Sequence, residues 1–240
     1  KQKARNKIMN RIKEAAILAA GIIILGVCIK WGIDDFAEKD RQVTVKGLAE
    51  KEVEADKVTW PIQTKELGND LATLYSNINA TTATIKAFLI KNGVKENEIE
   101  VNAPTVIDMN ANQYNQQINT YRYNITSTVT VTSRNVKLVR GIIARQGELL
   151  KQGVAVVAGD YENRIQYEYV SFQKMKPEMM QEAIKNAQTT AEKFAENSNS
   201  KINKIMRADQ GQFSIDDRDA NTPYIKKVRV VTTVTYSLKD

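Results

Sequence analysis

Residues 121–142 (YRYNITSTVTVTSRNVKLVRGI) contain the clearest strand of the chain, followed directly by the start of a helix. Across residues 119–132, tyrosine, isoleucine and valine alternate with asparagine and threonine, so one face of the strand is apolar and the other is rich in threonine. From about Asn135 the apolar residues recur at helical spacing, and Gly153 suits the end of this helix. Such a strand is typical of an antiparallel sheet that helices cover on one side only.

The spacing of apolar residues outward from this stretch predicts the remaining elements. Further strands are expected in residues 43–46, 58–62, 99–107, 165–169, 202–206 and 228–238, with Gly47 ending the first of them. Further helices are expected in residues 69–93 and from Pro177 onward. Residues 109–119 and 216–222 are polar and are expected to form loops. The order predicts an α+β protein, in which helices pack on one face of an antiparallel sheet.

Residues 15–29 (AAILAAGIIILGVCI) carry no charge and follow a segment rich in lysine and arginine. A helix needs about 20 residues to span a bilayer, and the run reaches this length when Lys30 snorkels to the interface. The excess of basic residues predicts a cytoplasmic tail in residues 1–14, a transmembrane anchor in 15–33, a linker in 34–40 and an extracytoplasmic domain in 41–240. The anchor residues expected to meet the lipid bilayer are Ala15, Leu18, Ile22, Ile23, Ile24, Leu25, Ile29, Lys30 and Trp31.

Three other interpretations of this N-terminal run remain open. A basic segment before a short apolar stretch is also the pattern of a cleaved signal peptide, although no A-x-A site follows it. Cys28 would be the lipidated residue of a lipoprotein, but Val27 stands where a small residue is expected. A buried core helix is disfavoured by the basic residues beside it.

Composition argues against several classes of function. Most of the excess positive charge lies in residues 1–14. In the rest of the chain lysine and arginine are interspersed with acidic residues, so we expect no nucleic-acid partner. Histidine is absent and Cys28 is the single cysteine, which excludes a disulfide framework, His-dependent triads and His-ligated zinc. Asp216, Asp217 and Asp219 lack the glycine and the closing glutamate of a calcium loop. We therefore expect no enzyme activity, no cofactor and no metal.

Several segments together resemble the SIMPL family, a family of unknown function. The resemblance lies in four segments: residues 43–62 (VTVKGLAEKEVEADKVTWPI), with Gly47, Glu52 and Asp56; the strand and helix of residues 121–142; the Ala-rich helix that runs into a strand in residues 183–205; and the closing strand of residues 228–238. The sequence departs from the family pattern at Ala55, where a proline is common, and in residues 197–200 (NSNS). The resemblance covers about residues 41–239.

The resemblance implies an extracytoplasmic protein of the bacterial envelope, here a single-pass protein of the inner membrane with its main domain in the periplasm. Family members lack an established catalytic mechanism, some assemble into large rings, and links to oxidative stress have been proposed for others. The resulting hypothesis is a membrane-anchored protein that self-assembles into a large homo-oligomer with a structural or scaffold role in the envelope and a link to stress protection. The alternative is a binding module that docks on another envelope complex.

Three surfaces are candidates for contacts between copies. Pro61 cannot donate to a ladder, so the strand that contains it is expected at a sheet edge or at a bulge. Alanine recurs at every fourth residue from Ala183, which suits close approach to a sheet or to a partner helix. With the Thr-rich face, these surfaces give the candidate contact residues Trp60, Pro61, Thr126, Thr128, Thr130, Ala183, Ala187 and Ala191.

Overall fold

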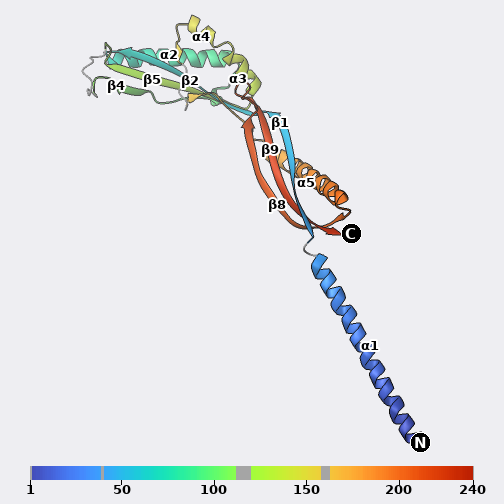
Figure 1. The fold of residues 1–240 in the computed structure, drawn as a ribbon. Helices are drawn as coiled ribbons and strands as arrows, with labels where there is room; N and C mark the ends of the chain where they lie inside the picture. Colours follow the sequence, from blue (N-terminus) through green and yellow to red (C-terminus); the bar gives the residue numbers. More distant parts are fainter. Residues whose placement is uncertain (1, 39–40, 112–119, 158–162, 240) are drawn as a thin grey trace. The chain divides into compact units, whose positions relative to one another are not determined.

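The structure is a computed structural model that describes residues 2–38, 41–111, 120–157 and 163–239. It is α+β, with antiparallel pairing wherever strand registers are defined (Figure 1). The chain forms two compact units. The first unit consists of residues 1–49, 178–213 and 229–240, and the second of residues 50–177 and 214–228. The boundaries between them fall inside long elements, namely β1 (Gln42–Glu54), α5 (Phe172–Asn197), β8 (Lys201–Asp217) and β9 (Ile225–Lys239).

The second unit is built on a six-stranded sheet whose central pair is β2 (Lys57–Gly68) and β5 (Tyr123–Ser133). These strands pair continuously from Val58 opposite Ser133 to Gly68 opposite Tyr123. On the far side of β5 lie β3 (Ile99–Val101) and β4 (Thr105–Asp108), and on the far side of β2 lie β6 (Val156–Val157) and β7 (Gln166–Glu168).

Helices cover one face of this sheet, because the apolar side chains of its two central strands point to that side. Figure 1 shows α2 (Leu71–Lys91), α3 (Val136–Ile143) and α4 (Gly147–Lys151) above the sheet, and the short helix η1 (Glu96–Glu98) precedes β3. Asp70 caps α2 by accepting the backbone N–H of Thr73 at 2.9 Å. The core between the layers joins Val58, Trp60, Ile62, Ile85, Leu89, Val129, Val131, Val139 and Leu149.

The first unit packs α5 against a three-stranded sheet with the order β1–β9–β8. Ala187 and Ala191 of the helix form a core cluster with Val45, Val234 and Tyr236 of the strands. Close packing here depends on Gly47, because a Cβ atom at this position would overlap the carbonyl oxygen of Ala183 and lie 2.7 Å from the backbone nitrogen of Ala187. The alanine row is therefore the surface on which the strand lies.

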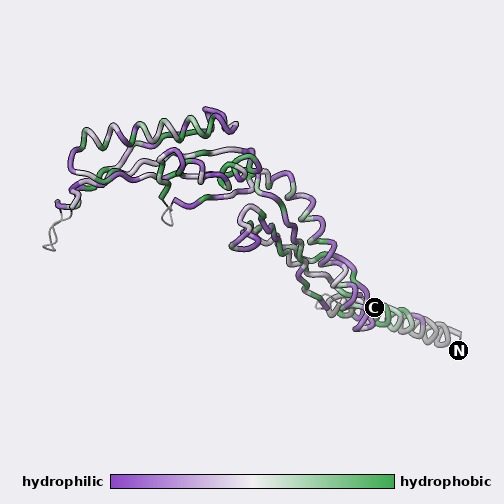
Figure 2. Tube along the Cα trace, turned by 90° about the horizontal axis from the view of Figure 1, so that it is seen from above, coloured by the Kyte–Doolittle hydropathy of each residue, from purple (hydrophilic) through white to green (hydrophobic). Residues whose placement is uncertain are grey.

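The N-terminal helix α1 (Gln2–Glu38) contains an 18-residue stretch, Ala16–Ile33, that is long and apolar enough to cross a membrane. None of this stretch is buried against the rest of the chain. Figure 2 shows hydrophobic colouring along this part of the helix. A helix of this kind near an N-terminus serves as a membrane anchor or as a signal sequence.

Most of the predicted elements are present, but four details of the prediction were wrong. The first strand runs through Gly47 to Glu54, because Gly47 serves close packing and does not end the strand. The predicted helix after Asn135 is two helices, α3 and α4, joined by a turn in which Arg145 N–H bonds to the carbonyl of Ile142, three residues back. The last helix begins at Phe172, so Pro177 lies inside it.

The fourth detail concerns the strand that contains Pro61. This strand, β2, is an inner strand, and its ladder with β5 shows no bulge at Pro61, which stands opposite Thr130. On its other side, β2 pairs with β7 through residues 57–59 and with β6 through residues 63–64. Pro61 falls in the interval between these two short neighbours, where a missing donor costs little. Most of the predicted loop in residues 109–119 lies outside the described residues.

Candidate functional site

The face of the second unit's sheet opposite α2 is a polar surface that we call the open face. Residues directly opposite each other in an antiparallel pair carry their side chains on the same face. The register therefore places two groups of β2 and β5 residues together: Thr59, Pro61, Gln63, Lys65 and Leu67 with Asn124, Thr126, Thr128 and Thr130. Ile107 of β4 stands opposite Asn124 and joins them. Besides Lys65, Glu100 of β3 lies on this face opposite Thr130, and the centre of the surface consists of threonine and amide side chains.

At one end of the open face an amide lies between two exposed apolar residues. Asn124 has Ile107 on one side and Leu67 on the other, and these two side chains are 58% and 50% exposed. The Oδ1 atom of Asn124 is buried and has no hydrogen-bond partner. A row of this composition has both apolar surface and an amide acceptor to offer to a partner.

Near the centre of the open face, a second amide oxygen is buried and unpaired. Gln63 lies between Thr128 of β5 and Val157 of β6 and is only 7% exposed. Its Oε1 atom has no hydrogen-bond partner. A buried acceptor without a partner costs about 1–3 kcal/mol, so such groups normally find a donor in protein or water. Two of them on one sheet face mark it as a candidate binding surface.

The structure separates the predicted contact residues into two groups. Thr126, Thr128, Thr130 and Pro61 are half-buried on the open face and remain candidates. Trp60 is a core residue at 2% exposure, because even-numbered positions of β2 point toward the helices. Ala183, Ala187 and Ala191 are fully buried within the first unit. The prediction that these last four residues contact another copy was therefore wrong.

The acidic loop is held by interactions within the chain. Asp217 forms an ion pair with Lys226, and Asp219 accepts hydrogen bonds from the hydroxyl of Thr222 and from the side chain of Arg218. These hydrogen bonds lower the pKa of Asp219 to about 2, and the bond from the Thr222 hydroxyl has the largest effect. Among the described residues no group of three metal-ligating side chains occurs. The loop is thus a structured turn between β8 and β9.

An aromatic cluster near this loop was missed from the sequence. Tyr167 of β7 meets the ring of Tyr224 edge-on, with centroids 6.2 Å apart, and the guanidinium of Arg140 lies 3.2 Å from the centroid of Tyr224. The alternation of residues 165–169 indicated the strand that carries Tyr167. Nothing in the sequence pairs Tyr167 with Tyr224, because the contact joins elements that are distant in the chain.

Asp56 ties the turn between β1 and β2 to the chain that follows β7. Its carboxylate accepts the backbone N–H groups of Val170 at 2.6 Å and Ser171 at 2.9 Å. Desolvation by burial would raise the pKa of Asp56, but the hydrogen bonds from Ser171 and Val170 outweigh it and lower the pKa below 3.8. A charged acceptor with two donors holds β7 against β2.

Replacing Asp56 with alanine should lower the free energy of unfolding by about 2 kcal/mol, because both backbone donors lose a charged acceptor. Urea unfolding at neutral pH measures this loss. Folding lowers the pKa of Asp56 in the wild-type protein. Its contribution to the free energy of unfolding is therefore complete above pH 3.8 and disappears as the pH falls through the lowered pKa of the folded state. Asp56→Asn should lose less at neutral pH, because an amide oxygen still accepts. Equal stability of Asp56→Ala and wild type would contradict this role.

Taken together, the chain is a protein with an apolar N-terminal helix followed by an α+β domain of antiparallel sheets, whose open face is rich in threonine and amide side chains. Residues 43–236 match the SIMPL family, described as a protein of unknown function (DUF541). The chain therefore belongs to the SIMPL family, as the sequence resemblance predicted. No curated protein matches the chain.

Proposed function

We propose that this SIMPL protein is anchored in the bacterial inner membrane by α1 and self-assembles in the periplasm into a homo-oligomer with a scaffold role. The observation that carries the proposal is the pair of unpaired amide oxygens, of Gln63 and Asn124, on the open face. Both amides lie at the open face, and a rotation of each amide toward the surface would let an identical face on a second copy supply the missing donors.

The chemistry of the open face favours a second copy as its partner. Asparagine and glutamine each carry both an acceptor oxygen and a donor NH₂ group, and threonine hydroxyls also do both. The same patch on two molecules related by a two-fold axis can therefore pair with itself. Exposed Ile107 and Leu67 add apolar surface that is withdrawn from water on contact.

The membrane helix supports assembly indirectly. A protein held in a bilayer is confined to a layer, which raises the effective concentration of its domain and allows modest contacts to be populated. The basic residues before the apolar run favour the orientation with residues 1–14 in the cytoplasm. The open faces of neighbouring copies would then meet in the same compartment.

Cysteine cross-linking in native membranes tests this proposal directly. Cys28 is the single cysteine, so Cys28→Ala gives a background without thiols into which Thr128→Cys is introduced. We expect mild oxidation to convert the variant to a covalent dimer of twice the 27.0 kDa chain, because Thr128 lies at the centre of the open face. A non-reducing gel measures the dimer fraction.

Thr189→Cys in the same Cys28→Ala background is the matched control. Thr189 is exposed on α5, and its hydroxyl donates a hydrogen bond to the carbonyl of Lys185 in the same helix. It should form little dimer under the same oxidation. The proposal fails if Thr128→Cys stays monomeric, or if Thr189→Cys forms dimers as fast, because the latter would reflect crowding in the membrane alone.

A further inference from the structure

The strand β7 has an edge without a strand partner. In the described part of the chain β7 pairs with β2 alone, through Lys57 opposite Glu168 and Thr59 opposite Gln166. An unpaired strand edge presents backbone N–H and C=O groups at the spacing that a further strand needs. Such an edge is a template for strand addition unless another segment covers it.

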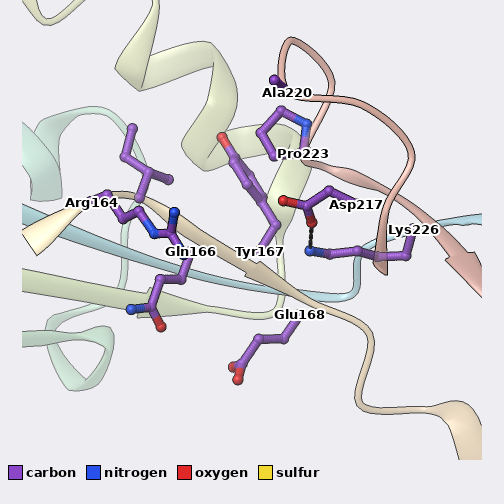
Figure 3. A pocket seen from close by; sticks show the side chains of 9 residues that line it. Arg164, Gln166, Tyr167, Glu168, Asp217, Ala220, Pro223 and Lys226 are labelled. Atoms are coloured by element: carbon purple, nitrogen blue, oxygen red, sulfur yellow. Dashed lines mark hydrogen bonds and ion pairs between the residues drawn. The ribbon is translucent and has the colours of Figure 1, made fainter. Parts of the chain in front are cut away.

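A cavity of about 610 Å³ runs along β7. Five consecutive residues, 164–168, form one wall, and the turn between β8 and β9 forms the other through Asp217, Ala220, Pro223 and Lys226 (Figure 3). A smaller cavity of about 250 Å³ continues along residues 167–170 toward Ile215. The side chains of consecutive strand residues point to opposite faces of the sheet. A cavity lined by five consecutive residues therefore runs along the edge of the strand and not over one face.

The walls of this cavity differ between the two faces of β7. On the face of Tyr167, a neighbouring hollow of about 480 Å³ is lined by Ile143, Ile165, Pro223 and Tyr224, with Arg140 over the ring of Tyr224. On the other face lie Gln166 and Glu168 (Figure 3). An added strand would therefore place alternate side chains in an aromatic hollow and against polar groups.

The charges along the cavity are largely paired within the protein. Glu168 forms a 2.7 Å ion pair with Lys57, and Asp217 pairs with Lys226, which is itself only 8% exposed. A charged ligand side chain would have to compete with these pairs. Uncharged polar side chains such as serine and threonine complement this wall better.

We propose that the free edge of β7 binds an extended peptide segment of a partner protein by strand addition. The segment has uncharged polar residues in alternation with apolar ones, and one apolar or aromatic side chain enters the hollow beside Tyr167 and Tyr224. Backbone hydrogen bonds to β7 provide affinity, and the hollow provides selectivity. The edge adjoins the open face, which carries Gln166 opposite Thr59. Strand addition uses the backbone of β7, so the inference does not depend on self-assembly.

Fluorescence anisotropy on the full-length protein in lipid nanodiscs tests the proposal. The probe is a labelled peptide in which threonine and valine alternate around a central phenylalanine, with empty nanodiscs as the blank. We expect saturable binding. Ala220→Trp should weaken it at least about tenfold, because Ala220 lines both the main cavity and the aromatic hollow. Ala103→Trp, at an exposed loop position, is the matched control and should bind like wild type.

Two methylated probes separate strand addition from non-specific apolar binding. N-methylation of alternate amides on one edge of the peptide removes the donors on that edge only. We expect one methylated peptide to lose binding and the other, methylated on the opposite edge, to retain it. The proposal is overturned if no saturable binding occurs, if Ala220→Trp binds as tightly as wild type, or if both methylated peptides bind like the parent.

Discussion

Replacing Gly47 with alanine is expected to lower the free energy of unfolding by about 3 kcal/mol or more. A Cβ atom at this position would overlap the carbonyl oxygen of Ala183 and lie 2.8 Å from the Cβ of Ala187. Both neighbours belong to a fully buried helix face, so β1 and α5 must move apart to make room. Overpacking a tight core costs about 1–3 kcal/mol, and more where backbone is involved. Urea unfolding of the detergent-solubilised protein measures the loss.

Gly141→Ala is the matched control for this change. Gly141 lies in α3, and a Cβ atom there would have nothing within 4 Å. Alanine in an exposed helix position should stabilise by about 0.5–1 kcal/mol. The opposite signs distinguish a packing effect from a general effect of replacing glycine. If Gly47→Ala is as stable as wild type, β1 and α5 do not approach each other closely enough to exclude a Cβ atom at this position.

Placing aspartate at both Ile23 and Ile24 is expected to abolish membrane retention. Both side chains lie near the middle of the apolar stretch Ala16–Ile33 and are more than half exposed. An aspartate at the centre of a spanning helix costs about 2.5–3.5 kcal/mol, so the pair opposes insertion by about 6 kcal/mol. The fraction of protein that stays in the membrane pellet after alkaline carbonate washing measures the effect.

The matched control replaces the same two residues with leucine. Leucine is as favourable as isoleucine in the bilayer core, so the protein should stay in the pellet. If the double aspartate variant is also fully retained, α1 is not what holds the protein in the membrane. The proposed anchoring by α1 would then be wrong.

The alternation of apolar and polar residues predicted much of the fold because burial in this protein follows simple periods. In β5, Ile125, Ser127, Val129 and Val131 are buried and the threonines between them are half-buried, as the two-residue period requires. The Thr-rich face of the candidate site was predicted on the same grounds. The register between strands was not predicted, because it depends on which distant strand becomes the neighbour.

Short-range patterns failed where long-range packing decides the outcome. Gly47 resembles a strand end, but it is needed where α5 passes close to β1. The alanine row suited close approach to a sheet or to a partner helix, and the structure packs it on a sheet of the same unit. Trp60 was expected to contact a second copy, and its position on the helix-facing side of β2 became clear only from the register. Each case involves residues far apart in the sequence.

The native mass of the detergent-solubilised full-length protein, beside its Thr128→Arg variant, tests the central claim most directly. Arginine at the centre of the open face should place like charges opposite each other across a symmetric contact, while Thr189→Arg serves as the control on exposed α5. We expect a discrete oligomer for wild type and for Thr189→Arg, and monomers for Thr128→Arg. A monomeric wild type, or an oligomer that Thr128→Arg leaves intact, would contradict self-assembly through the open face.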